Sequence, residues 1–398
     1  MQGSLIVAQS DFDQLCDEIQ QAGIVGFDTE FVSEFTYRPE LCLLQFATPG
    51  RCAAVDPYQV KDLSRWWDLM TSGEITVIVH GGREEVRFCL FATGKAPANL
   101  VDVQIAEGLR SPSFPLAYSA LIPRVTGKKI HGKETRTDWR KRPLTPRQVE
   151  YALEDVAYLL EVWERQSKDF EKRGRLEWAA AEFKRFMFDI QEERTRENWR
   201  RIPGSQKLSA RELGVLRELF QWRDKEAETR DRPARKTMRD DLLLELAHRQ
   251  PHNVQELTAT RDLNRTDYRR EAPAILAAIQ RGRDLPADQL PPVEKQQYKE
   301  EEQVLGQILA IALANLCLQE DVAQQLVGTV SDLRHLVRWH IYQDRSSGLP
   351  RLMSGWRAEV CGSLLTDILD GHITLRVADP LSDHPLIFER SPRLQKPD

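Results

Sequence analysis

Two pairs of polar side chains, far apart in the chain, are each spaced so that both members face one direction. Asp28 and Glu30 lie in GIVGFDTEF, an apolar segment typical of a strand. Residues i and i+2 of a strand point to the same face, so this strand would carry two carboxylates together. Tyr151 and Asp155 lie in EYALEDVAYLL, a helical pattern in which residues i and i+4 share a face. These spacings predict a fold in which one strand and one helix meet at a cluster of acids.

A third acidic segment, HGGREEVRF, supplies Glu84 and Glu85. Carboxylate oxygens are the hard ligands that Mg²⁺ and Mn²⁺ prefer, and such a set suits metal-assisted hydrolysis of a phosphodiester. Both glutamates also fall in a first helical turn, where acids favour the helix dipole without any further role. Asp102 is a rival for the third acid, although we expect it to cap the helix that follows it. We expect the metal role to fall on Glu85.

Composition sets the general class of the chain. At 398 residues it is long enough for two or three domains, and 41% hydrophobic with 29% charged residues is typical of a soluble globular protein. There is no apolar run of roughly 18 residues and no basic segment ahead of the first apolar stretch, so we expect neither a membrane span nor a signal peptide. The six cysteines form no CxxC pair, which favours reduced thiols in the cytoplasm over a zinc site.

The net charge of -5 does not suggest nucleic acid as a partner, but the local pattern does. Between residues 127 and 147, eight basic residues face only two acids. Such a stretch is either a solvated loop or a phosphate-binding surface, and its place just before the Tyr151 helix favours the second interpretation. The residues that we expect to contact substrate are Arg136, Arg140, Lys141 and Arg142, together with Arg232 in a second basic stretch and His80 at the end of a strand.

The order of apolar patterns predicts an α/β domain followed by helices. Strand-like runs occur at 4–9, 23–31, 41–48, 51–57 and 75–80, with helical patterns at 11–22, 61–71 and 84–91. A hairpin around Pro49-Gly50 favours a mixed sheet. Ser10 is a plausible helix cap, Thr145-Pro146 a good helix start and Gly174 a natural stop. We expect domains at 1–200, 205–285 and 295–378, and a loosely ordered tail at 379–398.

Several segments together resemble one known family. GFDTEF, LCLLQFAT, HGGREEVRF and TRTDWRKRPLTPRQVEYALEDVAYLL resemble the DEDD superfamily of 3′–5′ exonucleases, and the whole chain is similar to its ribonuclease D family. The segment LRELFQWRDKEAETRDRP resembles an HRDC domain, a small helical nucleic-acid-binding module. The resemblance implies a ribonuclease H-like mixed-sheet nuclease domain followed by two all-α HRDC-like domains.

The resemblance also implies roles for the acids. Asp28 would bridge two divalent ions, Mg²⁺ or Mn²⁺, with Glu30 and Asp155 completing the shell of the first ion. Tyr151 occupies the position at which the superfamily carries Tyr or His, and its hydroxyl would hold the attacking water. Glu85 stands where the family has aspartate, so its carboxylate is displaced by about 1.5 Å unless its surroundings adjust. Its implied role is to serve the second ion.

The implied activity is that of a monomeric 3′–5′ exoribonuclease. It would release nucleoside 5′-monophosphates from RNA with a free 3′ end, with precursor tRNA as the expected substrate. Two alternatives remain open at this stage. One is a DNA exonuclease of the Werner type, which shares the nuclease motifs. The other is an RNA-binding protein whose nuclease centre has decayed at Glu85.

Overall fold

The computed structural model describes residues 3–130, 137–193, 198–293 and 300–391, and its first domain is built on a six-stranded sheet. In sequence order the strands are β1 (Gly3–Ile6), β2 (Ile24–Val32), β3 (Glu40–Ala47), β4 (Cys52–Val55), β5 (Thr76–Val79) and β6 (Leu100–Asp102). In space the order is β1-β4-β3-β2-β5-β6. β3 is antiparallel to both of its neighbours, whereas β2, β5 and β6 run parallel. The predicted mixed sheet is confirmed, including the β3–β4 hairpin.

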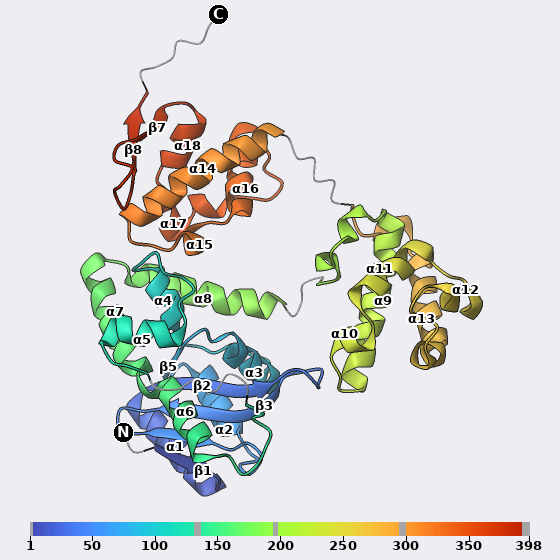
Figure 1. Ribbon diagram of the computed structural model, residues 1–398, viewed down its shortest axis with the longest axis horizontal. Helices are drawn as coiled ribbons and strands as arrows, with labels where there is room; N and C mark the ends of the chain where they lie inside the picture. Colours follow the sequence, from blue (N-terminus) through green and yellow to red (C-terminus); the bar gives the residue numbers. More distant parts are fainter. Residues whose placement is uncertain (1–2, 131–136, 194–197, 294–299, 392–398) are drawn as a thin grey trace, which may run out of the picture.

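Helices cover both faces of this sheet (Figure 1). One face packs on α1 (Gln9–Ala22), α2 (Ser64–Ser72) and α3 (Arg83–Thr93), and the other on α6 (Pro146–Ala157) and α7 (Leu159–Arg173). Alternation along β2 divides its side chains between the two faces. Phe27 packs on Trp66 of the first face, with ring centroids 4.7 Å apart, whereas Gly26 approaches Leu159 of the second. Asp28 and Glu30 therefore point toward α6, and Thr29 toward α3.

Three more helices complete the first domain and two helical domains follow it. The first set is α4 (Val103–Gly108), α5 (Tyr118–Thr126) and α8 (Leu176–Glu193). The second domain contains α9 (Ala210–Thr229), α10 (Ala234–Thr237), α11 (Asp240–Arg249), α12 (Val254–Ala259) and α13 (Thr266–Asp284). The third contains α14 (Glu300–Gln319), α15 (Gln324–Val327), α16 (Val330–Ile341), α17 (Gly355–Cys361), α18 (Leu364–Leu369), β7 (Ile373–Val377) and β8 (Leu386–Arg390).

The structure differs from the sequence-based expectation at several places. β8 lies inside the segment 379–398 that was predicted to be loosely ordered, and it pairs antiparallel with β7. The third block is therefore not purely helical. The first helix begins at Gln9 after Ala8, so Ser10 is not its cap. The cap at Thr145 and the left-handed stop at Gly174 are confirmed.

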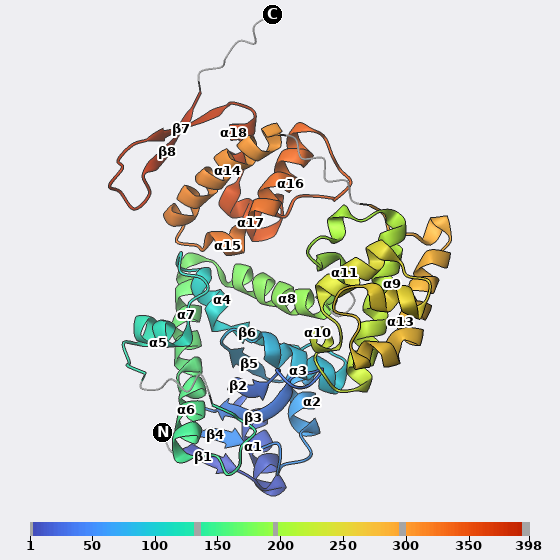
Figure 2. The same cartoon turned by 45° about the vertical axis from the view of Figure 1, so that its right-hand side comes forward.

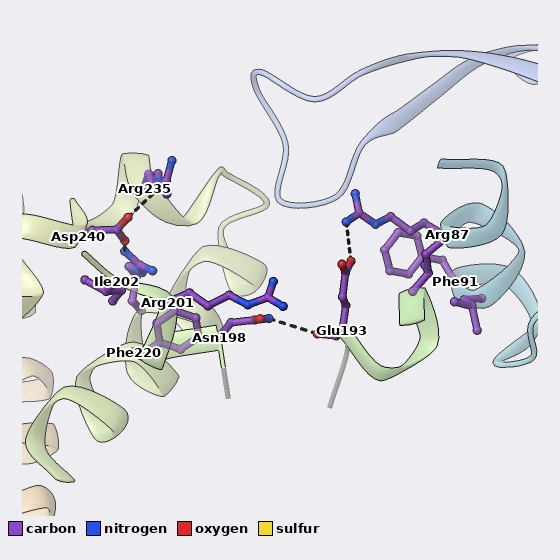
Figure 3. A pocket seen from close by; sticks show the side chains of 12 residues that line it. Arg87, Phe91, Glu193, Asn198, Arg201, Ile202, Phe220, Arg235 and Asp240 are labelled. Carbon is purple, nitrogen blue, oxygen red and sulfur yellow. Dashed lines mark hydrogen bonds and ion pairs between the residues drawn. The ribbon is translucent and has the colours of Figure 1, made fainter. Parts of the chain in front are cut away.

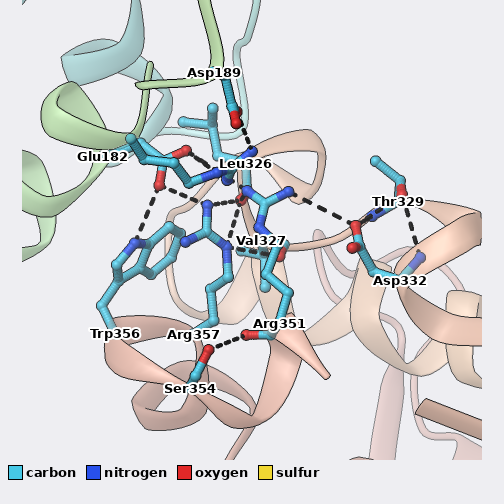
Figure 4. Close-up of polar contacts among 11 residues, drawn as sticks. Glu182, Asp189, Leu326, Val327, Thr329, Asp332, Arg351, Ser354, Trp356 and Arg357 are labelled. Carbon is cyan, nitrogen blue, oxygen red and sulfur yellow. Dashed lines mark hydrogen bonds and ion pairs between the residues drawn. The ribbon is translucent and has the colours of Figure 1, made fainter. Parts of the chain in front are cut away.

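The third domain shares a hydrophobic core with the nuclease domain. Trp178 on α8 stacks on Trp356 on α17, with ring centroids 5.3 Å apart. Beside them Glu182 accepts a 2.6 Å hydrogen bond from the Arg357 guanidinium, which also donates to the Leu326 carbonyl (Figure 4). The third domain is thus an integral part of the nuclease domain's packing.

α14 is long and apolar enough to cross a membrane by length and composition alone. Its buried side packs against α15, α16, α17 and α18 of the third domain. Its most apolar 18-residue window is 39% buried inside the structure. All six cysteines are also buried, and none forms a disulfide.

Candidate active site

The sheet topology places the first two carboxylates where one edge of β2 is no longer paired. β5 pairs with β2 only from Ile24 to Gly26, so the β2 edge from Asp28 onward has no strand beside it. The chain leaves β5 through the HGG turn and enters α3, which begins next to this open edge. Sites in sheets of this kind form at the carboxyl ends of parallel strands. Asp28 and Glu30 lie at that end of β2.

α6 brings Tyr151 and Asp155 over the same face. A reciprocal capping box between Thr145 and Gln148 fixes the start of the helix, with Pro146 at its first position. The helix packs on β3, β4 and β2, which aims the Tyr151–Asp155 side at the two strand acids. Tyr151 and Asp155 lie close enough to shift each other's pKa: the carboxylate raises that of the hydroxyl, and the hydroxyl lowers that of the acid. One strand and one helix therefore meet around the acids, as the spacings predicted.

The acids are buried close enough together to oppose one another's ionisation. Burial, then Glu85, Asp155 and Glu30, raise the pKa of Asp28 well above its usual range. Burial and the charges of Asp155 and Glu85 raise the pKa of Glu30 to about 8. Burial raises the pKa of Asp155 to about 7, partly offset by the Tyr151 hydroxyl. Such a site favours bound protons or a bound cation over several uncompensated negative charges.

Glu85 reaches the cluster from the opposite face of β2. It is 5% exposed, and its Oε1 accepts a 2.6 Å hydrogen bond from the Thr29 hydroxyl. Burial raises the pKa of Glu85 to about 7 while the Thr29 bond lowers it, and its charge acts on Asp28 and Glu30. Glu84 points elsewhere and pairs with Arg87 on its own helix. The structure thus brings Glu85, rather than Glu84, into the electrostatic cluster.

The carboxylate of Asp102, the rival third acid, accepts hydrogen bonds from backbone amides. Its two oxygens accept hydrogen bonds from the amides of Gly81, Gly82 and Gln104, at 3.0, 3.1 and 2.9 Å. The last of these is the predicted helix cap. The other two hold the turn that leads into α3 and therefore set the position of Glu85. We assign Asp102 a positioning role.

The HGG turn is shaped by packing. Gly81 has φ +68, and a Cβ on Gly82 would lie 2.3 Å from Val79 Cγ2. Gly82 closely approaches Val79, and the amides of both glycines bond to Asp102. His80 Nε2 lies 2.9 Å from the Leu116 carbonyl, and the ring meets Tyr118 edge-on. These contacts give His80 a structural role in place of the expected substrate contact.

The basic candidates separate into different environments. The Arg142 guanidinium donates two hydrogen bonds to the buried carboxylate of Asp56, at 2.7 and 2.9 Å. It also donates to the Cys42 carbonyl. It anchors the loop, and we withdraw it from the candidate substrate contacts. Arg140 remains at the site, Lys141 is exposed, and Arg136 lies outside the described residues.

Arg232, the candidate in the second domain, is half-buried and donates to the Lys236 carbonyl. That bond steadies the turn between α9 and α10. Thr29 and Tyr118 were not singled out in the sequence. Tyr118 donates to the Glu154 carbonyl and lies within electrostatic range of Asp155 and Asp28. Neither residue carries a local sequence signal, because both act through contacts made only in the folded chain.

Two cavities bear on substrate access: the first is lined by residues of the nuclease domain, and the second lies at its border with the second domain. The first, about 610 Å³, includes Glu30 and Tyr151 in its wall, together with Phe35 and Arg140. The second, about 390 Å³, lies between α3, the end of α8 and the second domain, and contains none of the site acids (Figure 3). There Glu193 binds Arg83 and Arg87 of α3. The first cavity is the one through which a substrate would reach the acids.

The donor set fits divalent cations. Among the described residues, no hydrogen bond or ion pair joins an Arg or Lys to Asp28, Glu30, Glu85 or Asp155. No three acid, His or Cys side chains of the described ranges stand close enough to share one ion as they are. Carboxylates with no cation between them repel. The site is therefore defined by the shared burial of these acids and by their mutual repulsion.

Comparison with known proteins places this arrangement in a family. Residues 5–170 match the family model described as 3'-5' exonuclease, and residues 212–279 match the HRDC domain. The chain is 30% identical to ribonuclease D of Bartonella henselae over 376 residues, covering 93% of this chain and 90% of that one. It belongs to the ribonuclease D family. Ribonuclease D of Gluconacetobacter diazotrophicus is 31% identical, covering 94% of each chain.

The fold agrees with this membership. The crystal structure of Escherichia coli RNase D, titled an exoribonuclease involved in structured RNA processing, superposes with TM-score 0.81 at 27% identity. It covers 94% of this chain and 100% of that one. The chain is thus a divalent-metal-dependent 3′–5′ exonuclease of the ribonuclease D family, with an HRDC domain after the nuclease domain. The nuclease–HRDC organisation predicted from the sequence is confirmed.

Proposed function

We propose that this chain removes nucleoside 5′-monophosphates one at a time from the 3′ end of RNA, using two divalent ions. The observation that carries this proposal is the meeting of Asp28, Glu30, Glu85 and Asp155 with the Tyr151 hydroxyl in one buried cluster. Membership of the ribonuclease D family supports RNA as the substrate. The Werner-type alternative would require DNA to be preferred.

Each side chain has a distinct task in this proposal. Asp28 would face both ions, Glu30 and Asp155 one of them, and Glu85 the other. When bound, Mg²⁺ or Mn²⁺ supplies Lewis acidity that lowers the pKa of water and offsets phosphate charge. Oxygen-only donors suit either ion. The β2–β3 ladder and the α6 capping box fix the backbone that carries Asp28, Glu30 and Asp155.

Tyr151 positions water and does not act as a base. Burial and the neighbouring carboxylates hold the pKa of Tyr151 above its usual value, so its hydroxyl stays protonated at neutral pH. It can therefore hold the water through a hydrogen bond without taking its proton. Holding the nucleophile in line with the phosphorus accounts for a large part of the rate in phosphoryl chemistry.

The helical domains would hold the body of a structured RNA while its 3′ end enters the cavity beside Glu30. Precursor tRNA is the substrate we propose, on the family resemblance alone. The same reasoning leads us to propose a monomeric, cytoplasmic enzyme. A single-stranded end with a free 3′ hydroxyl would be needed to reach the buried acids.

The test compares RNA and DNA of one sequence, labelled at the 5′ end, with Mg²⁺, Mn²⁺ or chelator. We expect stepwise shortening of RNA from the 3′ end that depends on metal. Asp155→Asn should lose at least about 100-fold in rate. Glu150→Gln, exposed on the same helix, is the matched control and should stay near wild type. No metal-dependent shortening would contradict the enzyme assignment, and faster loss of DNA would favour the Werner-type activity.

A further inference from the structure

The β2–β3 connection reaches from the active-site strand to the second domain (Figure 1). The Tyr37 hydroxyl donates to Asp224 Oδ2 at 2.9 Å, and the Tyr37 amide donates to Asp231 at 3.1 Å. Arg38 pairs with Glu228 at 2.7 Å. Turning the molecule by 45° places α10 next to this connection again (Figure 2). Tyr37 and Arg38 therefore fasten the nuclease domain to the HRDC domain.

Phe35, two residues before Tyr37, is not needed for this fastening. Its side chain stays 50% exposed although it lies between two domains. An aromatic ring that served only to join them would be covered by apolar contacts. The neighbours of Phe35 are instead cations: the Arg140 guanidinium 4.4 Å and the Lys236 ammonium 5.1 Å from the ring centroid.

These three side chains come from three segments and meet at the entrance to the acids. Phe35 belongs to the β2–β3 connection, Arg140 to the basic loop before α6, and Lys236 to α10 of the HRDC domain. Phe35 and Arg140 line the same 610 Å³ cavity as Glu30 and Tyr151. Asp138 already holds Arg140 in place through bonds of 2.9 and 3.2 Å.

An exposed ring beside two cations suits a single-stranded nucleic acid. Bases stack on aromatic faces regardless of sequence, and the phosphates on either side of a stacked base favour nearby Arg and Lys. We propose that Phe35 is a stacking platform for one base near the 3′ end of the RNA, with Arg140 and Lys236 binding the adjacent phosphates. This proposal rests on the proposed function and adds a specific contact to it.

The test measures binding with a short single-stranded RNA in which one abasic nucleotide is moved stepwise from the 3′ end. Asp155→Asn protein prevents cleavage, and fluorescence anisotropy gives the affinity. We expect one position at which loss of the base weakens binding. Phe35→Ala should bind the intact RNA about tenfold more weakly and lose the penalty at that position. Phe35→Trp should keep the penalty, and Phe35→Leu should lose it.

Tyr37→Phe is the control for domain fastening, because it removes the bond to Asp224 and leaves the platform intact. It should keep the position-specific penalty. Small-angle scattering on each variant reports whether the domains have separated. The proposal is overturned if Phe35→Ala binds as wild type does, or keeps the penalty. It is also overturned if the variant weakens binding equally at every position with separated domains. A wild-type protein that fails to shorten RNA would instead contradict the proposed function, whatever the binding data show.

Discussion

Glu85 reaches the Thr29 hydroxyl from the start of α3, and this contact gives the glutamate an anchor at the position where the resemblance implies aspartate. The extra methylene extends the carboxylate by about 1.5 Å, enough to require a new anchor. Thr29 provides it on the face of β2 opposite to Asp28 and Glu30. Asp102 holds the turn before α3 from behind. The longer acid is therefore supported on two sides.

Thr29→Val should weaken metal activation because it removes the hydrogen bond that favours the charged form of Glu85. We expect the Mg²⁺ concentration for half-maximal activity to rise roughly tenfold, within the range for loss of a supporting contact. Glu85→Asp should have equal or higher activity with Mg²⁺. In the Glu85→Asp background, Thr29→Val should then have little further effect, because the shorter acid does not reach Thr29. Equal losses in both backgrounds would rule out this coupling.

At the scale of elements, the sequence predicted those features that depend on the spacing of nearby residues. The i, i+2 pair on β2 and the i, i+4 pair on α6 lie where their spacing placed them, and the structure brings both pairs together. β8 was missed although its ladder partner β7 is close in sequence, and a distant residue also holds the start of the strand. The Asn315 side chain forms two 3.0 Å hydrogen bonds with the backbone of Leu386, which lies 71 positions later in the chain. No local pattern records such a contact.

Gly82→Ala tests whether the turn before α3 sets the position of Glu85 in the site. Its new Cβ would lie 2.3 Å from Val79 Cγ2 on β5, so either the strand end or the first turn of α3 must move. A shift of about 1 Å at Glu85 should lower kcat by up to about 100-fold. Gly50→Ala is the matched control, since nothing lies within 4 Å of its Cβ. Steady-state rates with saturating Mg²⁺ check this, and two equal kcat values would refute it.

At the scale of the molecule, the nuclease and third domains are held by one core with a charge pair inside it. Glu182 and Arg357 are 5% exposed each, and Arg357 has further partners in the Leu326 and Val327 carbonyls. Removing one partner of a buried pair leaves the other charge without compensation. The HRDC domain is attached differently, through exposed polar contacts of the β2–β3 connection. The two helical domains should therefore respond differently to perturbation.

Glu182→Gln should destabilise the nuclease and third domains together. We expect a loss of about 3–5 kcal/mol in the free energy of unfolding. Glu177→Gln, exposed on the same helix, should change it by less than about 0.5 kcal/mol. Urea unfolding followed by tryptophan fluorescence reports on Trp178 and Trp356 directly. An unchanged midpoint for Glu182→Gln would show that the pair contributes nothing to the joint core.

The pH dependence of stability should show the titration of the acid cluster in the intact chain. Without metal, the pKa values of Glu30, Glu85 and Asp155 are about 8, 7 and 7, above their ordinary values near 4. The folded state then binds more protons than the unfolded state between about pH 4 and 8. The stability contributed by these groups is therefore full below about pH 4 and is lost as pH rises to 8.

Divalent metal should reverse this trend, because the ions bind the deprotonated acids and compete with protons more effectively as pH rises. We expect the unfolding temperature in chelator to fall from pH 5 to pH 8, and the increase produced by Mn²⁺ to grow across the same interval. Asp155→Asn should flatten both curves, since it removes one of the opposing charges. Acids elsewhere, such as Asp56 with its lowered pKa, contribute equally to both proteins and cancel in the difference. Parallel curves for the two proteins would mean that the cluster does not titrate as a unit.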